Sequence, residues 1–211
     1  MRSLDWLKRA AELGNAPLAR LRIRRTLVAA AVLWCALAGA QAPPKVELAA
    51  PFVATPESVT HQMLSLAEIV PSDFVVDLGS GDGRLVIAAV VAYKARGGFG
   101  VEIDPALVAL ANDNARRAGV ADRVRFYEQD LFRADLSEAT VVTVYLLPAA
   151  MERLERKLLA ELKPGTRVIV EDYPFPTWRP VRVLDVDTLD KLKISGQTLT
   201  QLYLYRVPNR R

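Results

Sequence analysis

The residues best suited to hold a ligand lie in the stretch 75–84, which reads V-V-D-L-G-S-G-D-G-R. Two β-branched residues followed by Asp77 and Leu78 are typical of the end of a buried parallel strand. The rest of the stretch alternates glycines with polar residues: Gly79, Ser80, Gly81, Asp82 and Gly83. Glycine tolerates positive φ and lacks a Cβ, so this turn lets a ligand approach bare backbone. The apolar run 85–92 predicts a helix, whose first N–H groups and partial positive charge would face the same ligand.

The spacing of the glycines separates two kinds of ligand. A dinucleotide fingerprint, G-x-G-x-x-G, needs its third glycine at position 84, which is Arg84. The observed G-x-G-x-G, with Asp77 two residues before Gly79, resembles motif I of class I methyltransferases that use S-adenosylmethionine (SAM). SAM presents an ammonium and a sulfonium where a dinucleotide presents pyrophosphate, so an acid suits this turn better than a phosphate cradle. A glycine-rich turn of another α/β protein remains the alternative.

Two further acids follow at intervals that suit a nucleoside. Glu102 ends a predicted strand at 97–103, about where α/β nucleotide sites place the carboxylate that accepts both ribose hydroxyls. Asp104 precedes Pro105 and is expected mainly to cap the next helix. The methyltransferase resemblance implies that Asp130, after a strand at 124–128, binds the adenine amino group. It also implies that Leu131 packs on the adenine ring. The alternative for Glu102 is an acid that caps the next helix, and the alternative for Asp130 is an ordinary loop acid.

A fourth strand, at 140–147, is nearly all apolar and should be buried on both faces. Its end, Y-L-L-P, occupies the motif IV position beside the transferred methyl group, although it lacks the (Asn/Asp)-Pro-Pro-(Tyr/Phe) pattern of many amino-methylating enzymes. The Tyr145 hydroxyl and the carbonyl groups of Leu146 and Leu147 are suited to accept hydrogen bonds from an amine. Pro148 has no N–H to donate. The alternative role for Tyr145 is a core aromatic residue.

The remaining pattern predicts the architecture. Thr55-Pro56-Glu57 is expected to start a helix with Thr55 as its N-cap, and apolar residues at helical spacing extend that helix to about 69. Further helices are predicted at 106–118, with Leu110 among its inward residues, and at 149–162. Strands are predicted at 166–172, 182–187 and 199–207, and a Pro-rich aromatic loop is predicted at 173–180. The last two strands are expected to form a hairpin, because only the short segment 188–198 separates them. The predicted fold class is α/β: a three-layer, Rossmann-like, seven-stranded sheet with a C-terminal antiparallel hairpin.

Charge divides the chain of 211 residues into two parts. Residues 1–25 hold seven Lys/Arg and two Asp/Glu, a net charge of +5, whereas residues 26–211 hold 21 and 22, a net charge of −1. The basic balance therefore belongs to the leader. A nucleic-acid-binding domain needs a basic face of its own, so no nucleic-acid partner is expected.

The leader is expected to direct the chain to a membrane. Arg20–Arg25 is basic, 26–40 is apolar, and Ala38-Gly39-Ala40 suits signal-peptide cleavage. We therefore divide the chain into a leader (1–41), a linker (42–50) and a catalytic domain (51–211). A cleaved signal would export the domain away from cytosolic SAM, whereas a retained anchor would leave the arginines on the cytosolic side. Both readings stay open.

Four strings resemble a small family of membrane-associated protein-lysine methyltransferases: PFVATPESV, DLGSGDGR, GVEIDP and EDYPFPTW. That family includes the enzyme acting on the ATP-synthase c subunit and has bacterial relatives. The resemblance implies SAM as the cofactor, a protein substrate, possibly a membrane protein, and a lysine amine as acceptor. No metal site is expected, because His61 is the only histidine and no second His or Cys is available to it as a metal partner.

The resulting site assignment has two parts. The residues expected to bind SAM are Thr55, Asp77, Gly79, Ser80, Gly81, Gly83, Glu102, Asp130 and Leu131, and those expected beside the methyl acceptor are Tyr145, Leu146 and Pro148. One alternative is a small-molecule or lipid methyltransferase, with a membrane-facing pocket at Phe175–Trp178. Another is a non-catalytic, membrane-tethered SAM-binding module. A NAD-dependent oxidoreductase is disfavoured by Arg84.

Overall fold

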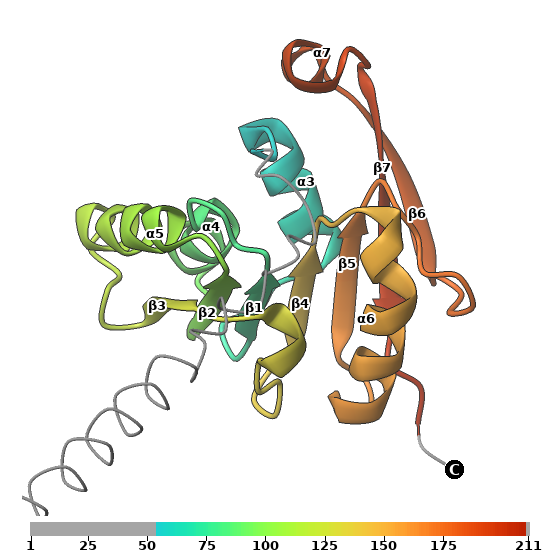
Figure 1. Ribbon diagram of the computed structural model, residues 1–211, viewed down its shortest axis with the longest axis horizontal. Coiled ribbons are helices and arrows are strands. Elements are labelled where there is room, and N and C mark those ends of the chain that lie inside the picture. Colours follow the sequence, from blue (N-terminus) through green and yellow to red (C-terminus); the bar gives the residue numbers. More distant parts are fainter. Residues whose placement is uncertain (1–53, 210–211) are drawn as a thin grey trace, which may run out of the picture. The chain divides into compact units, whose positions relative to one another are not determined.

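A seven-stranded sheet in the order β3-β2-β1-β4-β5-β7-β6 organises the protein (Figure 1). The computed structural model describes residues 54–209, except the side chains of 193–195, so the predicted leader and linker lie outside the described residues. The strands are β1 (Phe74–Leu78), β2 (Gly97–Glu102), β3 (Val124–Glu128), β4 (Val141–Val144), β5 (Arg167–Glu171), β6 (Arg182–Asp187) and β7 (Leu199–Arg206). Strands β1 to β5 pair in parallel, and β7 runs antiparallel to both β5 and β6. The predicted fold class is confirmed.

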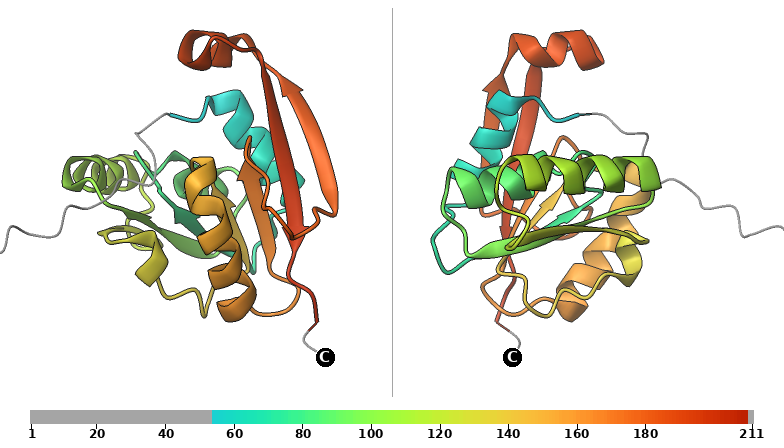
Figure 2. Two further views of the ribbon diagram at one scale, coloured as in Figure 1. Left: turned by 45° about the vertical axis from the view of Figure 1, so that its right-hand side comes forward. Right: turned by 90° about the vertical axis from the view of Figure 1, so that its left-hand side faces the viewer.

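Helices cover both faces of the sheet (Figure 2). The described helices are α3 (Glu57–Leu66), α4 (Arg84–Val91), α5 (Pro105–Arg117), the 3-10 turn η1 (Leu131–Arg133), α6 (Pro148–Glu161) and α7 (Leu189–Ser195). One apolar layer joins α3, α4 and α5 to the sheet, and a second joins α6 to the opposite face. All four residues of β4 are buried, because a parallel strand between two helical layers has no solvent face.

Successive residues of one strand pack alternately into the two apolar layers. Val75 and Val141 lie in the layer with α3 to α5, whereas Val76 and Val142 lie in the layer with α6. Side chains of a strand point alternately to the two faces, so a one-residue slip would exchange the two layers. The buried pattern therefore fixes the register that places the strand ends.

Three local predictions were wrong. Helix α3 begins after Pro56 and has no side-chain cap, because the Thr55 hydroxyl bonds elsewhere. It ends at Leu66, before Glu68, whose φ of 52° is left-handed. Leu110 is exposed, since α5 packs mainly through smaller residues. The prediction that Asp104 caps α5 is confirmed by its bond from the Ala106 amide.

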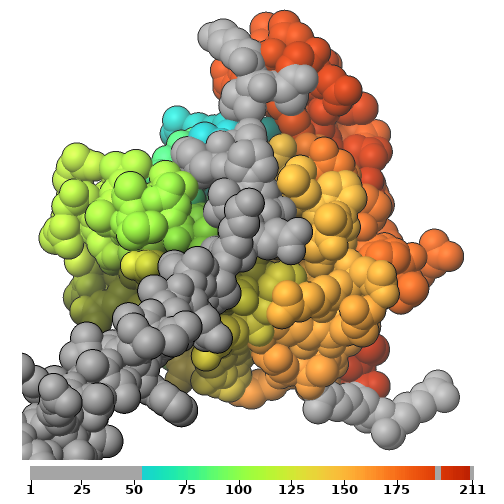
Figure 3. Space-filling view, in the orientation of Figure 1, coloured from blue at the N-terminus to red at the C-terminus, as the bar shows by residue number. Residues whose placement is uncertain are grey.

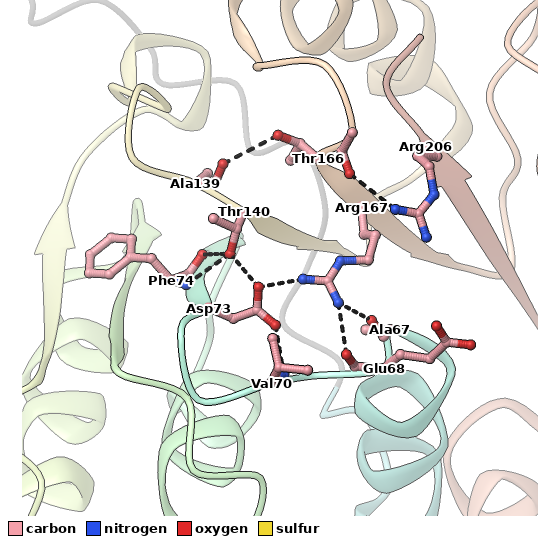
Figure 4. Close-up of polar contacts among 11 residues, drawn as sticks. Ala67, Glu68, Val70, Asp73, Phe74, Ala139, Thr140, Thr166, Arg167 and Arg206 are labelled. Carbon is pink, nitrogen blue, oxygen red and sulfur yellow. Dashed lines mark hydrogen bonds and ion pairs between the residues drawn. The ribbon is translucent and has the colours of Figure 1, made fainter. Parts of the chain in front are cut away.

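A polar clamp holds the amino edge of the sheet (Figure 4). The Arg167 guanidinium pairs with the buried Asp73 carboxylate and donates to the carbonyl oxygens of Ala67 (2.7 Å) and Glu68 (2.8 Å). The Thr140 hydroxyl donates to Asp73 at 2.8 Å. The clamp thus joins β5, the end of α3 and the residues that precede β1 and β4.

Replacing Arg167 should destabilise the fold strongly. Arg167→Met is expected to lower the free energy of unfolding by about 3–5 kcal/mol, because it leaves a buried carboxylate unpaired. The matched control is Arg182→Met, which breaks an exposed pair with Glu68 at 3.3 Å and should cost less than about 1 kcal/mol. Urea unfolding of both variants measures the difference, and equal losses would contradict the assigned role of the clamp.

Candidate functional site

Three neighbouring strands end in one row at the carboxyl edge of the sheet. Leu78 pairs with Val144, and Val144 pairs with Val170. The next residues are therefore Gly79, Tyr145 and Glu171, on strands that lie about 4.8 Å apart. The chain reverses its direction of travel across the sheet between β1 and β4, and α/β proteins bind ligands at such a switch point. This row is the candidate site.

The glycine turn has the backbone that its sequence predicts. Gly79, Gly81 and Gly83 have φ values of 88°, 51° and 83°, all in the left-handed region that favours glycine. The amides of Gly79 and Ser80 donate to the Val101 carbonyl at 2.9 and 3.0 Å, which fastens the turn to β2. The Ser80 hydroxyl is buried without a hydrogen-bond partner among the described residues. A buried orphan hydroxyl beside a bare-backbone turn suits a polar ligand, so these residues fit SAM.

Gly100 lacks the Cβ that would collide with the glycine turn, and the sequence analysis did not identify this residue. A Cβ at Gly100 would lie 2.4 Å from the Ser80 Cβ and 2.6 Å from the Phe126 ring. A Cβ at Gly83 would meet the same ring at 2.5 Å. The glycine-rich run G-G-F-G in a strand is a signal of such close approach and could have identified the position.

The Glu102 carboxylate contacts the turn directly. It accepts hydrogen bonds from the amides of Gly81 (3.0 Å), Ile103 (2.7 Å) and Asp104 (3.1 Å). The two predicted SAM-binding segments are thus brought together. A carboxylate offers about four lone-pair positions, so three such bonds leave acceptor capacity for a ribose hydroxyl.

Asp77 is a buried carboxyl group whose charge is suppressed. Its Oδ1 accepts from the Thr143 hydroxyl at 2.7 Å. The pKa of Asp77 is raised to about 7: burial is the main cause, the Thr143 bond opposes it, and the charges of Glu102 and Asp82 add to the rise. A cation placed beside Asp77 would favour the carboxylate form. Thr143 is a second residue that sequence reasoning missed.

The remaining predicted residues lie around this turn. Asp130 accepts from the Phe132 amide at 2.9 Å and caps η1, and Leu131 is buried behind it. Leu146 packs against the turn, since a Cβ on Gly79 would come within 3.2 Å of its side chain. Pro148 is exposed and begins α6. The individual ligand roles of these residues stay predictions.

A tether of long-range contacts covers the turn. The Arg84 guanidinium binds Asp82 through Nε (2.9 Å) and Nη2 (2.5 Å), and its Nη1 donates to the Thr55 carbonyl at 2.7 Å. The Thr55 hydroxyl donates to the buried Glu171 carboxylate at 2.8 Å. The segment before α3 therefore bridges the start of α4 and the end of β5. Arg84, whose place in the glycine spacing disfavours a dinucleotide, makes one side of this bridge.

A pair of acids, Glu171 and Asp172, lies at the β5 end of the row. Glu171 and Asp172 follow the buried core of β5, and both lie near Lys191 and Thr200. Burial raises the pKa of Glu171, while the Thr55 bond and Lys191 oppose that rise. Burial, followed by the charges of Glu171 and Asp172, raises the pKa of the Tyr145 hydroxyl well above its usual value. An acid at the end of a buried strand is the signal that identified Asp77. The same signal could have identified Glu171 and Asp172, and the sequence analysis did not use it there.

Sheet order, glycine turn and acid series together define a class I SAM-dependent methyltransferase. The chain belongs to the ANTKMT methyltransferase family, whose domain model matches residues 77–182. This confirms the resemblance found in the sequence.

Individual relatives agree with that assignment. A protein-lysine N-methyltransferase of Saccharolobus islandicus (strain REY15A) is 41% identical over 155 residues, covering 74% of this chain and 92% of the relative. The adenine nucleotide translocase lysine N-methyltransferase of Mus musculus is 40% identical over 141 residues, covering 67% of this chain but only 61% of that protein. An RNA methyltransferase from Salinibacter ruber, crystallised with S-adenosyl-L-homocysteine, is 45% identical with a TM-score of 0.67 and covers 75% of this chain and 96% of that one.

Filling the space at Gly100 should weaken SAM binding. Gly100→Ala places a methyl group against Ser80, and overpacking of about 1–3 kcal/mol corresponds to a loss of affinity of roughly 5- to 150-fold. Gly119→Ala is the control: its φ of 69° makes alanine strained there, but its Cβ meets nothing within 4 Å and the position follows α5, outside the glycine turn. Calorimetric titration with S-adenosylhomocysteine should show unchanged affinity in the control. Equal affinities in both variants would contradict the assigned turn.

Proposed function

We propose that this methyltransferase acts on the ε-amine of a lysine in a protein. The observation that carries the proposal is the Glu171–Asp172 acid pair, which lies in the same row as the SAM turn, two strands away. Carboxylates bind an approaching ammonium, whereas phosphate-bearing substrates are repelled by them. The lysine substrates named for the archaeal and mouse relatives support the same acceptor.

SAM, the acceptor lysine and Tyr145 have separate roles in the reaction. SAM supplies an electrophilic methyl group on a sulfonium. A lysine acceptor has a free pKa of about 10.4 and must lose a proton before its nitrogen can attack. The raised pKa of Tyr145 keeps its hydroxyl protonated, so this residue orients the amine and does not act as the base. Alignment of the reacting groups in such a row can lower the activation free energy by about 7–11 kcal/mol.

The aromatic loop gives little support to the lipid alternative. Phe175 is buried, stacks on Trp178 with ring centroids 5.5 Å apart, and donates its amide to the Tyr205 hydroxyl at 3.0 Å. A membrane-facing pocket at Phe175–Trp178 would favour the lipid alternative, but Phe175 belongs to the core beside α6.

RNA is the second candidate acceptor, because the similar Salinibacter structure is that of an RNA methyltransferase. Residues 54–209 contain 18 Lys/Arg and 21 Asp/Glu, a net charge of −3. RNA binding draws most of its affinity from basic side chains on phosphates. Protein is therefore the favoured acceptor.

A labelling experiment tests this choice. The full chain, incubated with methyl-labelled SAM and either a membrane-protein extract or total RNA, should label protein, with the label recovered as methyl-lysine by mass spectrometry. Gly81→Arg should abolish labelling. Tyr145→Phe should keep SAM affinity and slow turnover about tenfold, the equivalent of one lost hydrogen bond. Label confined to RNA, or to residues other than lysine, would refute the proposal.

We also propose that residues 20–40 direct the chain to a membrane, as a cleaved signal or a retained anchor. The basic cluster followed by an apolar run supports this. Within residues 54–209, no helix is long and apolar enough to cross a bilayer. The full chain should be found in the membrane fraction if the segment is retained, or exported if it is cleaved, whereas deletion of 20–40 should leave the protein in the cytosolic fraction. A full chain found wholly in the cytosolic fraction would contradict the proposal.

A further inference from the structure

A lysine side chain is buried at the end of the catalytic row. Lys191 is 3% exposed. Its Nζ lies 2.5 Å from the Asp172 carboxylate and 3.5 Å from that of Glu171, and it also bonds to the Thr200 hydroxyl. Lysines are almost never fully buried unless paired, and desolvating such a group is costly. Its position therefore calls for an explanation.

The surroundings of the Lys191 ammonium are those that an acceptor lysine needs. An ammonium has three N–H donors, and Asp172, Glu171 and Thr200 supply three oxygen acceptors around it. The ammonium also lies 5.9 Å from the Tyr145 ring centroid, within the range of a cation–π contact. Tyr145 is the residue that the sequence places beside the methyl acceptor, so the pocket adjoins the reacting centre.

Among the residues of α7 whose side chains the structure describes, Lys191 is the one that is buried. Leu189 is 73% exposed, Leu192 is 47% exposed, and Asp190 is also exposed. The helix stands at the end of the β6–β7 hairpin, beyond the edge of the sheet (Figure 1), and this segment forms one margin of the space-filling view (Figure 3). A further described contact is Ser58 to Thr188, 3.1 Å between hydroxyls. Withdrawal of Lys191 thus breaks polar contacts, while Leu189 and Leu192 are already exposed.

We propose that Glu171, Asp172 and Thr200 form the acceptor-ammonium pocket, and that Lys191 occupies it until a substrate lysine displaces it. The inference rests on the proposed lysine acceptor and names its binding site. One ammonium replaces another, so the incoming group recovers the same contacts. A guanidinium is planar and larger, so it would not match this arrangement of acceptors.

Methyl transfer in this pocket uses Glu171 as the base. The bound ammonium gives one proton to the Glu171 carboxylate. The nitrogen lone pair then forms a bond to the methyl carbon as the carbon–sulfur bond of SAM breaks. The products are a methylated ammonium and S-adenosylhomocysteine, and Glu171 returns its proton to water after product release.

Emptying the pocket provides a test that does not need the natural acceptor. The full-length Lys191→Ala variant, given SAM and n-butylamine, should methylate the amine at least about tenfold faster than the wild type, a factor equivalent to about 1.4 kcal/mol. n-Butylamine should also raise the melting temperature of the variant, whereas the neutral isostere n-butanol should not. Lys157→Ala is the control, because Lys157 is a mostly buried lysine on α6 that bonds to Ala134 and Glu161. It should gain neither response.

Measurements on the wild type guard against misfolding of the variant. Increasing n-butylamine should raise amide hydrogen exchange in residues 188–198 and leave α6 unchanged, because the amine displaces Lys191. Stabilisation of Lys191→Ala by n-butylamine without methylation would overturn the inference and leave a structural ion pair. Unchanged exchange in 188–198 would overturn it as well. Methylation of n-butylamine by the variant, combined with wild-type labelling of RNA alone, would instead refute the proposed function and retain the pocket.

Discussion

The register between β1, β4 and β5 is the constraint on which the site depends. Each strand contributes its next residue to one row, and these are a glycine, a tyrosine and a glutamate. β4 is buried on both faces, so a shift by one residue would drive the row apart and exchange the two apolar layers. Packing that looks purely structural therefore sets the order of cofactor turn, orienting hydroxyl and acid pair.

The two edges of the sheet use charged groups differently. At the amino edge, Arg167 and Asp73 are surrounded by backbone carbonyls and a threonine, with each charge compensated locally. At the carboxyl edge, Asp77 and Glu171 are buried acids whose pKa values burial raises. Their ionised forms are unfavourable in the free protein, and ligands that carry positive charge favour them.

Local patterns predicted the fold well, while contacts between distant residues escaped sequence reasoning. The glycine spacing, the capping Asp104 and the hairpin of β6 and β7 depend on short stretches of chain. The Thr55 bond to Glu171 joins residues 116 positions apart, and its existence removed the helix cap that the local pattern favoured. Arg84 and Lys191 are charged residues whose partners come from other elements, so no periodicity or motif announces them. Helix α7 was missed because seven residues give too little pattern.

The protonation of Asp77 couples the cofactor turn to acidity. Its folded pKa of about 7 lies above the unfolded value of 3.8, so this group stabilises the fold fully below about pH 3.8, and that contribution is lost as the pH rises toward 7. The empty turn thus loses stability in the same range in which its carboxylate becomes available. A pKa of about 7 means that both forms of this carboxyl group coexist near neutral pH, so the charge offered to an incoming sulfonium compound changes with pH.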